Sequence, residues 1–360
     1  MIENQTNQEG NWTEADLMKL KTFVNQLEHS EKIILIFIAV FTILGNTLVL
    51  VATWRERSLH QPNKYFIACL AVADLLVGLF LAPIKAYKLD LRVRQRTMSI
   101  HLCRFVVWID TFALTTSIYT LTFISFDRYL KISKPLQYMT RMTTSTSLKL
   151  IFIIVFISSC IASYAATPRS GSIGILFSGA SSCSEADFDQ TKSFYTFMII
   201  GMFFVPTGVI AVMYVLIFLV AHKRQKMRRN GELGQTRSQR TALYEDLKVI
   251  KMLMIVVGVF IICWGPNIIW VILHYHFPNL LYTNSRSIHH NYRMFTIRMV
   301  FSILPLFNSL CNPIIYAFLD RKYKEAFKHL FRRCIHRPIS IRPQAPNSIE
   351  LPRSRNPGPR

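Results

Sequence analysis

Charged side chains are scarce in this chain of 360 residues. They make up 17% of it, whereas 51% of the residues are hydrophobic, and about a quarter of the residues of a soluble domain are usually charged. Acids are the rarer sign, with 20 Asp and Glu against 42 Lys and Arg and a net charge of +22. Because most of the basic residues lie between long apolar runs, the excess favours a membrane protein over a nucleic-acid-binding protein.

The sequence also lacks the residue clusters that metal and redox chemistry require. Its seven cysteines are scattered, too few for a disulfide scaffold, and form no Cys-x-x-Cys pair of the kind that binds zinc. No nucleophile stands out beside a base or a metal cluster, so we expect a protein that is not an enzyme and uses no cofactor. Internal repeats are absent, and polar residues instead of a cleavable signal peptide follow Met1.

Seven apolar stretches are long enough to cross a membrane. Each reaches the roughly 20 residues that a helix needs to span about 30 Å of hydrocarbon. They cover residues 33–54, 66–87, 103–127, 148–167, 194–221, 248–274 and 297–318. Prolines inside several of them are tolerated where neighbouring groups satisfy the freed carbonyls. The expected fold is an all-α membrane protein, a seven-transmembrane helix bundle.

Basic residues are distributed unequally between the two ends of this bundle. Of the 42 Lys and Arg, 27 fall in the connections 55–64, 130–149, 222–251 and 319–360. The positive-inside rule places these connections in the cytoplasm and the N-terminus outside the cell, as expected for a multi-pass protein of the cell membrane. Two sequons of the outer segment then predict glycosylation at Asn4 and Asn11.

The tail begins with an amphipathic segment. Tyr323, Phe327, Leu330 and Phe331 lie among basic residues, a pattern that favours a short helix along the membrane face. Cys334 at its end is a candidate for palmitoylation, with an inert thiol as the alternative. We therefore expect three regions. They are an extracellular segment 1–32, a transmembrane bundle 33–318 and a cytoplasmic tail 319–360.

A polar stripe runs along the third span. Cys103, Asp110 and Ser117 follow one another at steps of seven residues, or two helical turns, and so lie close to one face. A carboxylate inside a membrane is costly unless it faces water, a cation or a hydrogen-bonding partner, so Asp110 is a functional candidate. The alternative is a structural carboxyl group that neighbouring hydroxyls satisfy or that stays protonated. Cys103 can pair with Cys183 of the second outer loop, because both lie in the oxidising compartment.

The third span ends with Asp127-Arg128-Tyr129. Arg128 lies 18 residues beyond Asp110, about 27 Å along a helix, so the two groups belong to opposite faces of the membrane. At the cytoplasmic end of the sixth span, Asp246 can reach Arg128. We therefore expect Asp110 to face a ligand on one side of the membrane and Arg128 to face the cytoplasm on the other.

Taken together, these features resemble the rhodopsin-like family of G-protein-coupled receptors over nearly the whole chain. The motifs occur in the family's order, which makes the combination much more specific than any one of them. They are Gly45-Asn46, Leu70-Ala71-Val72-Ala73-Asp74, Asp127-Arg128-Tyr129, Pro206 with Tyr214, Cys263-Trp264-Gly265-Pro266 and Asn312-Pro313-Ile314-Ile315-Tyr316. The resemblance implies a receptor that transmits the binding of an extracellular ligand to a heterotrimeric G-protein. Arrestin, receptor kinases and membrane lipid are its other expected partners.

The same resemblance implies a buried sodium site and a switch. The sodium site comprises Asp74, Ser117, Asn308, Ser309 and Asn312, with a water-filled polar network as the alternative. Ile118, Pro206 and Phe260, below Trp264, are similar to the packing trio that rearranges when the sixth helix moves. On activation, Arg128 would release Asp246 and turn towards Tyr214 and Tyr316, opening a groove for the C-terminal helix of the G-protein. Leu136 matches the apolar loop residue that contacts the G-protein.

Asp110 matches the position at which receptors for biogenic amines hold the ligand's ammonium. The rest of that pattern is incomplete, because Asn267 and Ile268 replace two phenylalanines, and Ile303 and Leu306 replace a Trp and a Tyr. The fifth span has no serine for catechol hydroxyls, so a catecholamine is not expected. The residues expected to contact the ligand are Asp110, Thr111, Met198, Met202, Trp264, Asn267 and Ser302.

Other ligands and functions remain as alternatives. A basic rim assigned to the first outer loop would attract an acidic peptide or a nucleotide, and a lipid is a further alternative. That rim consists of Lys85, Lys88, Arg92, Arg94 and Arg96. A retinal protein is disfavoured because Leu306 occupies the place of the Schiff-base lysine. A transporter or channel is disfavoured because repeated halves are missing.

Overall fold

The computed structural model describes residues 13–56, 59, 61–94, 96, 98–174, 187–229, 237–281 and 288–335. Within these ranges the chain forms helices joined by turns and short connections, and it contains no strand. The helices of the first half are α2 (Glu14–Arg55), α3 (Pro62–Leu76), η2 (Val77–Leu81), α4 (Ala82–Val93), α5 (Ile100–Ser133), α6 (Pro135–Arg141) and α7 (Thr144–Ala165). Those of the second half are η3 (Pro168–Ser170), α8 (Phe188–Ile199), η5 (Ile200–Phe204), α9 (Val205–Arg229), α10 (Arg237–His276), α11 (Pro278–Leu281), α12 (Ile288–Leu319) and α13 (Arg321–Ile335).

Seven helical segments among the described residues are long and apolar enough to cross a membrane, which confirms the expected seven-helix fold. They are Glu14–Arg55, Lys64–Arg92, Ile100–Ser133, Thr144–Ala165, Phe188–Lys223, Lys248–His276 and Ile288–Leu319. The second span joins α3, η2 and α4, and the fifth joins α8, η5 and α9. The chain is therefore a multi-pass membrane protein.

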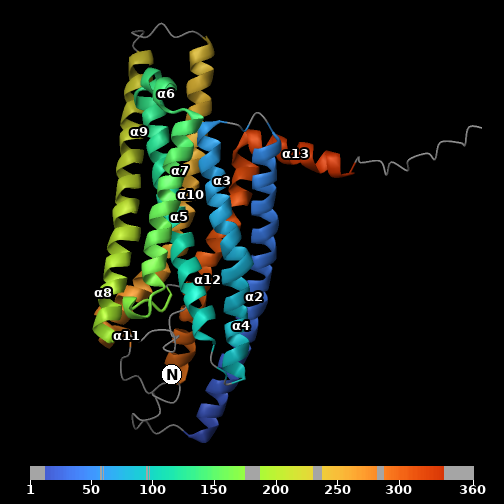
Figure 1. Ribbon diagram of the computed structural model, residues 1–360, viewed down its shortest axis with the longest axis vertical. Coiled ribbons are helices and arrows are strands. Elements are labelled where there is room, and N and C mark those ends of the chain that lie inside the picture. Colours follow the sequence, from blue (N-terminus) through green and yellow to red (C-terminus); the bar gives the residue numbers. More distant parts are fainter. Residues whose placement is uncertain are drawn as a thin grey trace, which may run out of the picture.

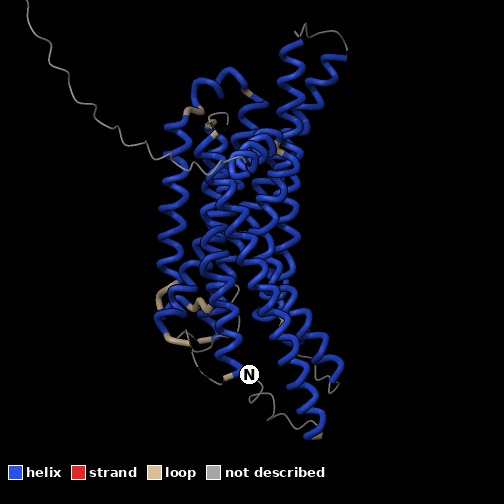
Figure 2. Tube along the Cα trace, turned by 90° about the vertical axis from the view of Figure 1, so that its right-hand side faces the viewer, coloured by secondary structure: helices blue, strands red, loops and turns tan. Residues whose placement is uncertain are grey.

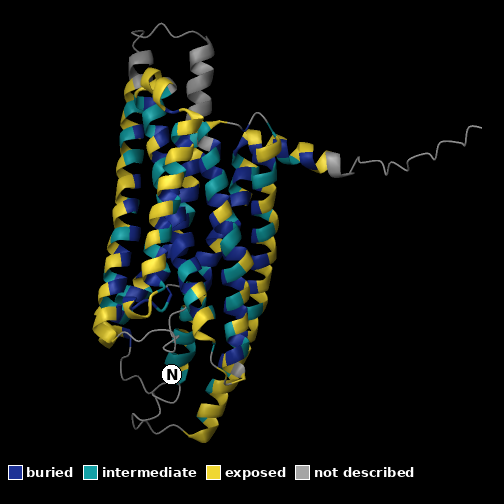
Figure 3. Ribbon diagram, in the orientation of Figure 1, coloured by how far each residue is buried: buried dark blue, intermediate teal, exposed yellow. Residues whose placement is uncertain are grey.

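The seven spans run side by side along the long axis of the molecule (Figures 1 and 2). The chain enters the bundle at one end, and α13 lies across the opposite end, nearly at right angles to the spans (Figure 1). We call these the N-terminal end and the α13 end. Exposed residues cover the outside of the bundle and buried residues fill its middle (Figure 3). Many exposed side chains are large and apolar, as expected where lipid replaces water.

The first helix begins much earlier than the apolar pattern indicates. Thr13 caps α2, because its hydroxyl oxygen accepts a hydrogen bond from the Asp16 backbone N–H at 3.2 Å. Glu14 and Asp16 then place negative charge at the positive end of the helix dipole. Hydropathy detects the lipid-contacting part from residue 33 onwards, whereas residues 14–32 form a polar continuation of the same helix.

Two π-helical turns interrupt the second and fifth spans just before a proline. Segment η2 precedes Pro83, and η5 precedes Pro206. A proline ring collides with the carbonyl four residues earlier and has no N–H to donate, so a wider turn accommodates it without ending the helix. Met202 lies within the second π-helical turn, so this irregularity decides which residues of the fifth span face inward.

A small residue brings the first and seventh spans into close contact. A Cβ atom at Gly45 would lie 2.9 Å from the Cβ of Pro313, so a larger side chain there would force α2 and α12 apart. The neighbouring Asn46 donates from Nδ2 to the carbonyl of Ser309 at 3.1 Å and to the carbonyl of Thr42 at 3.0 Å. The close approach of the backbones makes this bridge between the helices possible.

The fourth span, α7, contains no tryptophan and packs through small residues. Ser158 on α7 is fully buried. The indole comes from the neighbouring α5, where Trp108 donates from Nε1 to the Ser163 hydroxyl at 3.1 Å. Trp108 also stacks on Phe112, with ring centroids 4.9 Å apart. A tryptophan on α5 therefore contributes the aromatic contact between α5 and α7.

Buried polar contacts attach α13 to the bundle. Lys64 of α3 forms an ion pair with Asp320, and both side chains are 4% exposed. Asp320 also accepts hydrogen bonds from the backbone N–H groups of Lys322 and Tyr323 at the start of α13. A 2.8 Å hydrogen bond joins the hydroxyls of Tyr323 and Thr53. The Lys64 ammonium lies 4.6 Å from the centroid of the Tyr323 ring. Burial raises the pKa of the Tyr323 hydroxyl, which therefore stays protonated.

Replacing Lys64 with Met leaves the Asp320 carboxylate buried without its cation. We expect the K64M variant to lose about 3–5 kcal/mol of unfolding free energy, measured by thermal or chemical unfolding in detergent micelles. The double variant K64M/D320N removes both charges and should recover most of that loss. A K64M variant as stable as the unsubstituted protein would show that this ion pair does not hold α13 in place.

Candidate functional site

Asp110 lies on α5, about three turns from the start of that helix at the N-terminal end of the bundle. Its residue is 1% exposed, and it interacts electrostatically with Lys85 and Tyr195. The side chains of Cys103, Asp110 and Ser117 are all buried. A carboxylate at this depth provides a strong site for a cation, because the surroundings screen its charge weakly.

Two other predicted ligand contacts carry buried polar atoms with no protein partner. The Thr111 hydroxyl and the Asn267 Nδ2 make no hydrogen bond among the described residues, although the two residues are 1% and 4% exposed. An unsatisfied buried donor costs about 1–3 kcal/mol. A bound molecule that pairs with these atoms would recover that cost, which is the behaviour expected at a binding site.

The remaining predicted ligand contacts lie on three different helices. Met198 and Met202 are buried on the fifth span, and the Tyr119 hydroxyl donates to the Met202 sulfur at 3.1 Å. Trp264 is buried on α10, with its ring centroid 6.1 Å from that of Phe260. Ser302 on α12 is partly exposed and contacts Lys85, which the sequence analysis placed elsewhere.

Lys85 is the main correction to the sequence analysis. The basic rim was assigned to the first outer loop, but Lys85 lies within α4, is 7% exposed and points into the bundle. Its ammonium lies 3.1 Å from Glu31 Oε1 and donates at 2.9 Å to both the carbonyl and the hydroxyl of Ser302. The π-helical segment η2 separates Lys85 from Asp74, so the spacing of a regular α-helix gave no signal for the inward placement of Lys85.

Ion pairs between α2 and α4 neutralise part of the predicted rim. Arg92 Nη1 lies 2.7 Å from Glu28 Oε1, and Lys32 Nζ lies 2.7 Å from Asp90 Oδ1. Together with the Glu31–Lys85 pair, they form a ladder along the helical extension of α2. Arg94 and Arg96 of the rim are exposed.

A group of aromatic residues at the same end was missed. Tyr195 and Tyr275 stack with ring centroids 4.9 Å apart and with their planes 16° from parallel. The Tyr195 hydroxyl donates to the Gly174 carbonyl at 2.9 Å, which ties α8 to the connection after α7. The two rings come from the fifth and sixth spans, 80 positions apart, so sequence spacing gave no indication of the pair.

Asp74, the buried carboxylate among the five residues predicted for a sodium site, interacts with two of the other four, Ser309 and Asn312. Asn312 donates from Nδ2 to Asp74 Oδ2 at 2.8 Å, and the Ser309 hydroxyl also bonds to Asp74. The Oδ1 atoms of Asn308 and Asn312 accept no hydrogen bond in the described part of the chain. Ser117 is buried on α5 but makes no hydrogen bond to Asp74 in this structure.

This oxygen-rich set is suited to a hard monovalent cation. A carboxylate and amide oxygens that lack donors are the ligands such a cation prefers. Among the described residues, no group of three or more His, Cys, Asp or Glu side chains could hold a metal ion. Any ion bound beside Asp74 would therefore rely on one carboxylate and several neutral oxygens.

At the α13 end, Arg128 pairs with its neighbour in sequence. Arg128 Nη2 lies 2.6 Å from Asp127 Oδ2, and both side chains are buried. Asp127 also accepts a 3.0 Å hydrogen bond from the Tyr138 hydroxyl of α6. The side chain of Asp246, the predicted partner of Arg128, lies outside the described part of the structure.

The other predicted switch residues occupy the interior of the bundle. Ile118, Pro206 and Phe260 are all buried. Tyr214 interacts electrostatically with Arg128, and its hydroxyl oxygen is buried. Tyr316 stacks on Tyr323 with centroids 5.8 Å apart. Leu136, at the start of α6, is 82% exposed.

Several predicted modification sites cannot be placed. Cys103 forms a disulfide bond, but Cys183, its predicted partner, lies outside the described residues. The same holds for Asn4 and Asn11 and for the side chain of Cys334. Glycosylation, palmitoylation and the identity of the disulfide partner therefore stay predictions.

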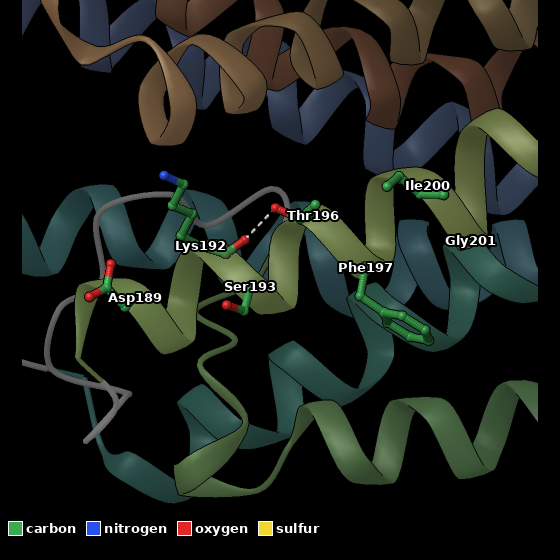
Figure 4. A pocket seen from close by; sticks show the side chains of 7 residues that line it. All are labelled: Asp189, Lys192, Ser193, Thr196, Phe197, Ile200 and Gly201. Carbon is green, nitrogen blue, oxygen red and sulfur yellow. Dashed lines mark hydrogen bonds between the residues drawn. The ribbon is translucent and has the colours of Figure 1, made fainter.

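A groove of about 690 Å³ lies along α8 and η5 (Figure 4). It is lined by Asp189, Lys192, Ser193, Thr196, Phe197, Ile200 and Gly201. Phe197 and Ile200 are 60% and 53% exposed, so the groove lies on the outer surface of the bundle, whereas Met198 and Met202 of the same span are buried. The groove is thus separate from the predicted ligand contacts.

Seven spans, a buried acid near one end and a buried arginine near the other define a transmembrane receptor. The family model of seven-transmembrane receptors of the rhodopsin family matches residues 45–316, and the chain belongs to this family of G-protein-coupled receptors. Trace amine-associated receptor 5 of Mus musculus is 29% identical over 317 residues, covering 82% of this chain and 83% of that receptor. The alpha-1A adrenergic receptor of Rattus norvegicus is 26% identical over 336 residues, covering 83% and 67%. Trace amine-associated receptor 7e of the same species is 29% identical over 316 residues, covering 81% and 79%.

Proposed function

We propose that this receptor responds to a small extracellular ligand with a cationic amine, which Asp110 holds through its ammonium. The observation that carries the proposal is the Asp110 carboxylate itself, 1% exposed on α5 near the end of the bundle at which the chain enters. A charge-assisted hydrogen bond to an ammonium is strong in such surroundings. The names of the trace amine-associated and adrenergic relatives agree with this ligand class.

The other proposed contacts surround the part of the ligand beyond its ammonium. Met198, Met202 and Trp264 supply an apolar surface suited to a hydrocarbon or aromatic body. Thr111 and Asn267 supply a hydroxyl and an amide whose buried polar atoms have no partner in the described chain. Ile303 and Leu306 are buried, so no tyrosine hydroxyl from α12 orients the acid at those positions. The proposed site therefore offers the ligand fewer polar groups than an amine-receptor pocket in which a tyrosine hydroxyl contacts the acid.

Signal transmission would depend on a second packing of the same bundle. Ligand held between α5 and α10 would favour a rearrangement around Ile118, Pro206 and Phe260, which lie below Trp264. At the other end, Arg128 would leave its acidic partners and turn towards Tyr214 and Tyr316, exposing a groove for the G-protein's C-terminal helix. Leu136 is exposed and available to the same partner. The ligand drives the change by binding one packing more tightly than the other.

We also propose that a sodium ion stabilises the inactive packing. Asp74, Asn308, Ser309 and Asn312 would hold it, with Ser117 approaching from α5. When bound, the ion supplies positive charge that offsets the buried carboxylate. Asn308 Oδ1 and Asn312 Oδ1 support the proposal, because they are buried oxygens that accept no hydrogen bond within the described chain.

The proposed setting is the cell membrane, with the N-terminus outside and the tail in the cytoplasm. The excess of Lys and Arg in the connections at the α13 end supports this orientation. Residues 1–32, 33–318 and 319–360 would then form the extracellular segment, the bundle and the cytoplasmic tail. Arrestin and receptor kinases are further partners that we propose from membership of the family.

Replacing Asp110 with Ala removes the proposed counterion for the ligand. We expect the D110A variant to lose its response to a cationic agonist, with a rise of at least about hundredfold in the concentration needed, equivalent to about 2.7 kcal/mol. Surface expression, measured with an N-terminal epitope, should be retained. The D90N variant is the matched control, because Asp90 is an acid at the same end whose partner is Lys32. A D110A dose response equal to that of the unsubstituted receptor would reject the counterion role.

Removing either acid that is proposed to restrain Arg128 should raise signalling without ligand. We expect D127N and D246A each to increase ligand-free G-protein dissociation several-fold, because the guanidinium loses a favourable charge partner in the inactive packing. The measurement is basal signal per receptor at the cell surface. Basal signal unaltered in both variants would count against the restraint.

A sodium site at Asp74 predicts that NaCl weakens agonist binding to the unsubstituted receptor, while KCl at equal ionic strength has a smaller effect. In the D74N variant, which lacks the carboxylate charge, the difference between the two salts should disappear. Agonist competition binding on membranes measures both. A difference that persists in D74N would place the ion elsewhere.

A further inference from the structure

The groove along the fifth span is polar at one end and apolar at the other. Its lining residues follow the spacing i, i+3, i+4, i+7, i+8, i+11 and i+12, so they form one stripe along α8 and η5. The polar ones, which come first, are Asp189, Lys192, Ser193 and Thr196, and the stripe continues with Phe197, Ile200 and Gly201. Figure 4 shows the two charged side chains at one end of the groove and the Phe197 and Ile200 side chains towards the other. The proposed amine site makes no use of this stripe.

The change of polarity along the groove matches the change across one leaflet of a membrane. Asp189 lies at the start of the fifth span, and Gly201 follows it by 12 positions, about 18 Å along a helix. Half of the hydrocarbon core of a bilayer measures about 15 Å. Phe197 and Ile200 are exposed, as expected for apolar side chains of a membrane span that contact lipid. The groove is therefore suited to an amphiphile whose polar end lies at the N-terminal end of the bundle.

Two charges of opposite sign mark the polar end of the groove. Asp189 and Lys192 are three residues apart, yet neither has an ion-pair partner in the part of the chain that the structure describes. A zwitterionic head group would offer each of them an opposite charge, a phosphate for the lysine and an ammonium for the aspartate. An anionic head group would be repelled by Asp189. A sterol has one hydroxyl and no charge, so it would leave both side chains without a partner.

The apolar end of the groove has room for a hydrocarbon chain, because Gly201 carries no side chain there. A Cβ atom built at Gly201 has no other atom within 4 Å. The polar end lies beside the sixth span. The Thr196 hydroxyl donates to the Lys192 carbonyl at 2.7 Å, so in its 2.9 Å contact with His276 of α10 the Nε2 of the imidazole is the donor. A molecule in the groove would thus contact the fifth span where that span is bonded to α10.

We propose that this groove is a binding site for one zwitterionic phospholipid. Lys192 holds its phosphate, Asp189 holds its ammonium, and an acyl chain lies along Phe197, Ile200 and Gly201. With the N-terminus outside the cell, the lipid belongs to the outer leaflet. The inference goes beyond the proposed amine receptor and does not depend on it.

Phospholipids that share their acyl chains and differ in head group test the site. The probes are phosphatidylcholine, phosphatidylethanolamine, anionic phosphatidylglycerol and diacylglycerol without a head group, with cholesterol as the sterol. They are added to purified full-length receptor in detergent. Bound lipids are counted by native mass spectrometry, and the rise in unfolding temperature reports binding to the folded state. We expect one tightly bound zwitterionic lipid, with a half-maximal effect at a concentration at least about tenfold lower than for phosphatidylglycerol, diacylglycerol or cholesterol.

Filling the apolar end of the groove should exclude the lipid. We expect the G201L variant to need at least about tenfold more phosphatidylcholine than the unsubstituted receptor for the same thermal shift. G208L is the matched control, because Gly208 is an exposed glycine of the same span with no atom within 4 Å of an added Cβ, and it lies outside the groove. Leucine favours a helix over glycine in both variants, so a general gain in stability cancels in the comparison. G208L should bind the lipid as the unsubstituted receptor does.

Charge variants separate recognition of the head group from burial of the acyl chain. K192M should bind phosphatidylcholine no more tightly than diacylglycerol, because the phosphate has lost its cation. D189N should bind phosphatidylglycerol about as tightly as phosphatidylcholine, because the repulsion of the anionic head group is removed. K223M is the control, since Lys223 is an exposed lysine at the other end of the same span. The preference for zwitterionic lipid should survive in K223M.

Two results would overturn the inference. Phosphatidylglycerol or cholesterol binding to the unsubstituted receptor as tightly as phosphatidylcholine would exclude a zwitterionic site. Equal lipid effects in G201L and G208L would show that lipids cover the outer surface without a specific site in the groove. Neither readout requires an agonist or a G-protein, so failure here would leave the proposed amine receptor standing, and failure of the amine proposal would leave the lipid site standing.

Discussion

The structure depends on one constraint, which is that an ionisable group inside an apolar bundle needs a partner on another helix or in a bound molecule. This need joins the spans at several levels. Glu31 pairs with Lys85 near one end, Asn312 donates to Asp74 in the middle, and Lys64 pairs with Asp320 near the other end. Each contact links segments far apart in the sequence. The polar residues therefore fix how helices that share an apolar surface are placed relative to one another.

The same constraint separates structure from function. Asp320 is satisfied by a lysine, by two backbone N–H groups and by its position at the start of α13, so it serves as an anchor. Thr111 and Asn267 bury polar atoms that no described side chain satisfies. Such atoms cost free energy in the empty bundle and gain a partner when a molecule binds. The proposed ligand site includes atoms of this kind, as do other parts of the bundle, such as those around Thr42 and Ser158.

Much of the fold could be predicted from local patterns. Seven apolar runs of sufficient length account for seven spans, and the amphipathic tail forms α13. Helix boundaries were less accurate, because hydropathy detects contact with lipid whereas a helix ends where its caps lie. Thr13 caps α2 well before the apolar run begins. Lys85 was misassigned for a related reason, because a charged residue near the end of a span resembles a loop residue until its partners are known.

The sequence alone determined the number of spans, the family motifs and the placement of Asp110 and Arg128 towards opposite ends of the third span, because length, composition and helical spacing act within a single segment. Tertiary structure alone decided that Lys85 reaches Glu31 and Ser302, that Tyr195 stacks on Tyr275, and that Arg128 pairs with Asp127. The first two are contacts between separate helices, and the third depends on side-chain rotamers. Sequence periodicity encodes neither kind of contact, because each depends on how the packed helices rotate and on which partner lowers the cost of a buried charge.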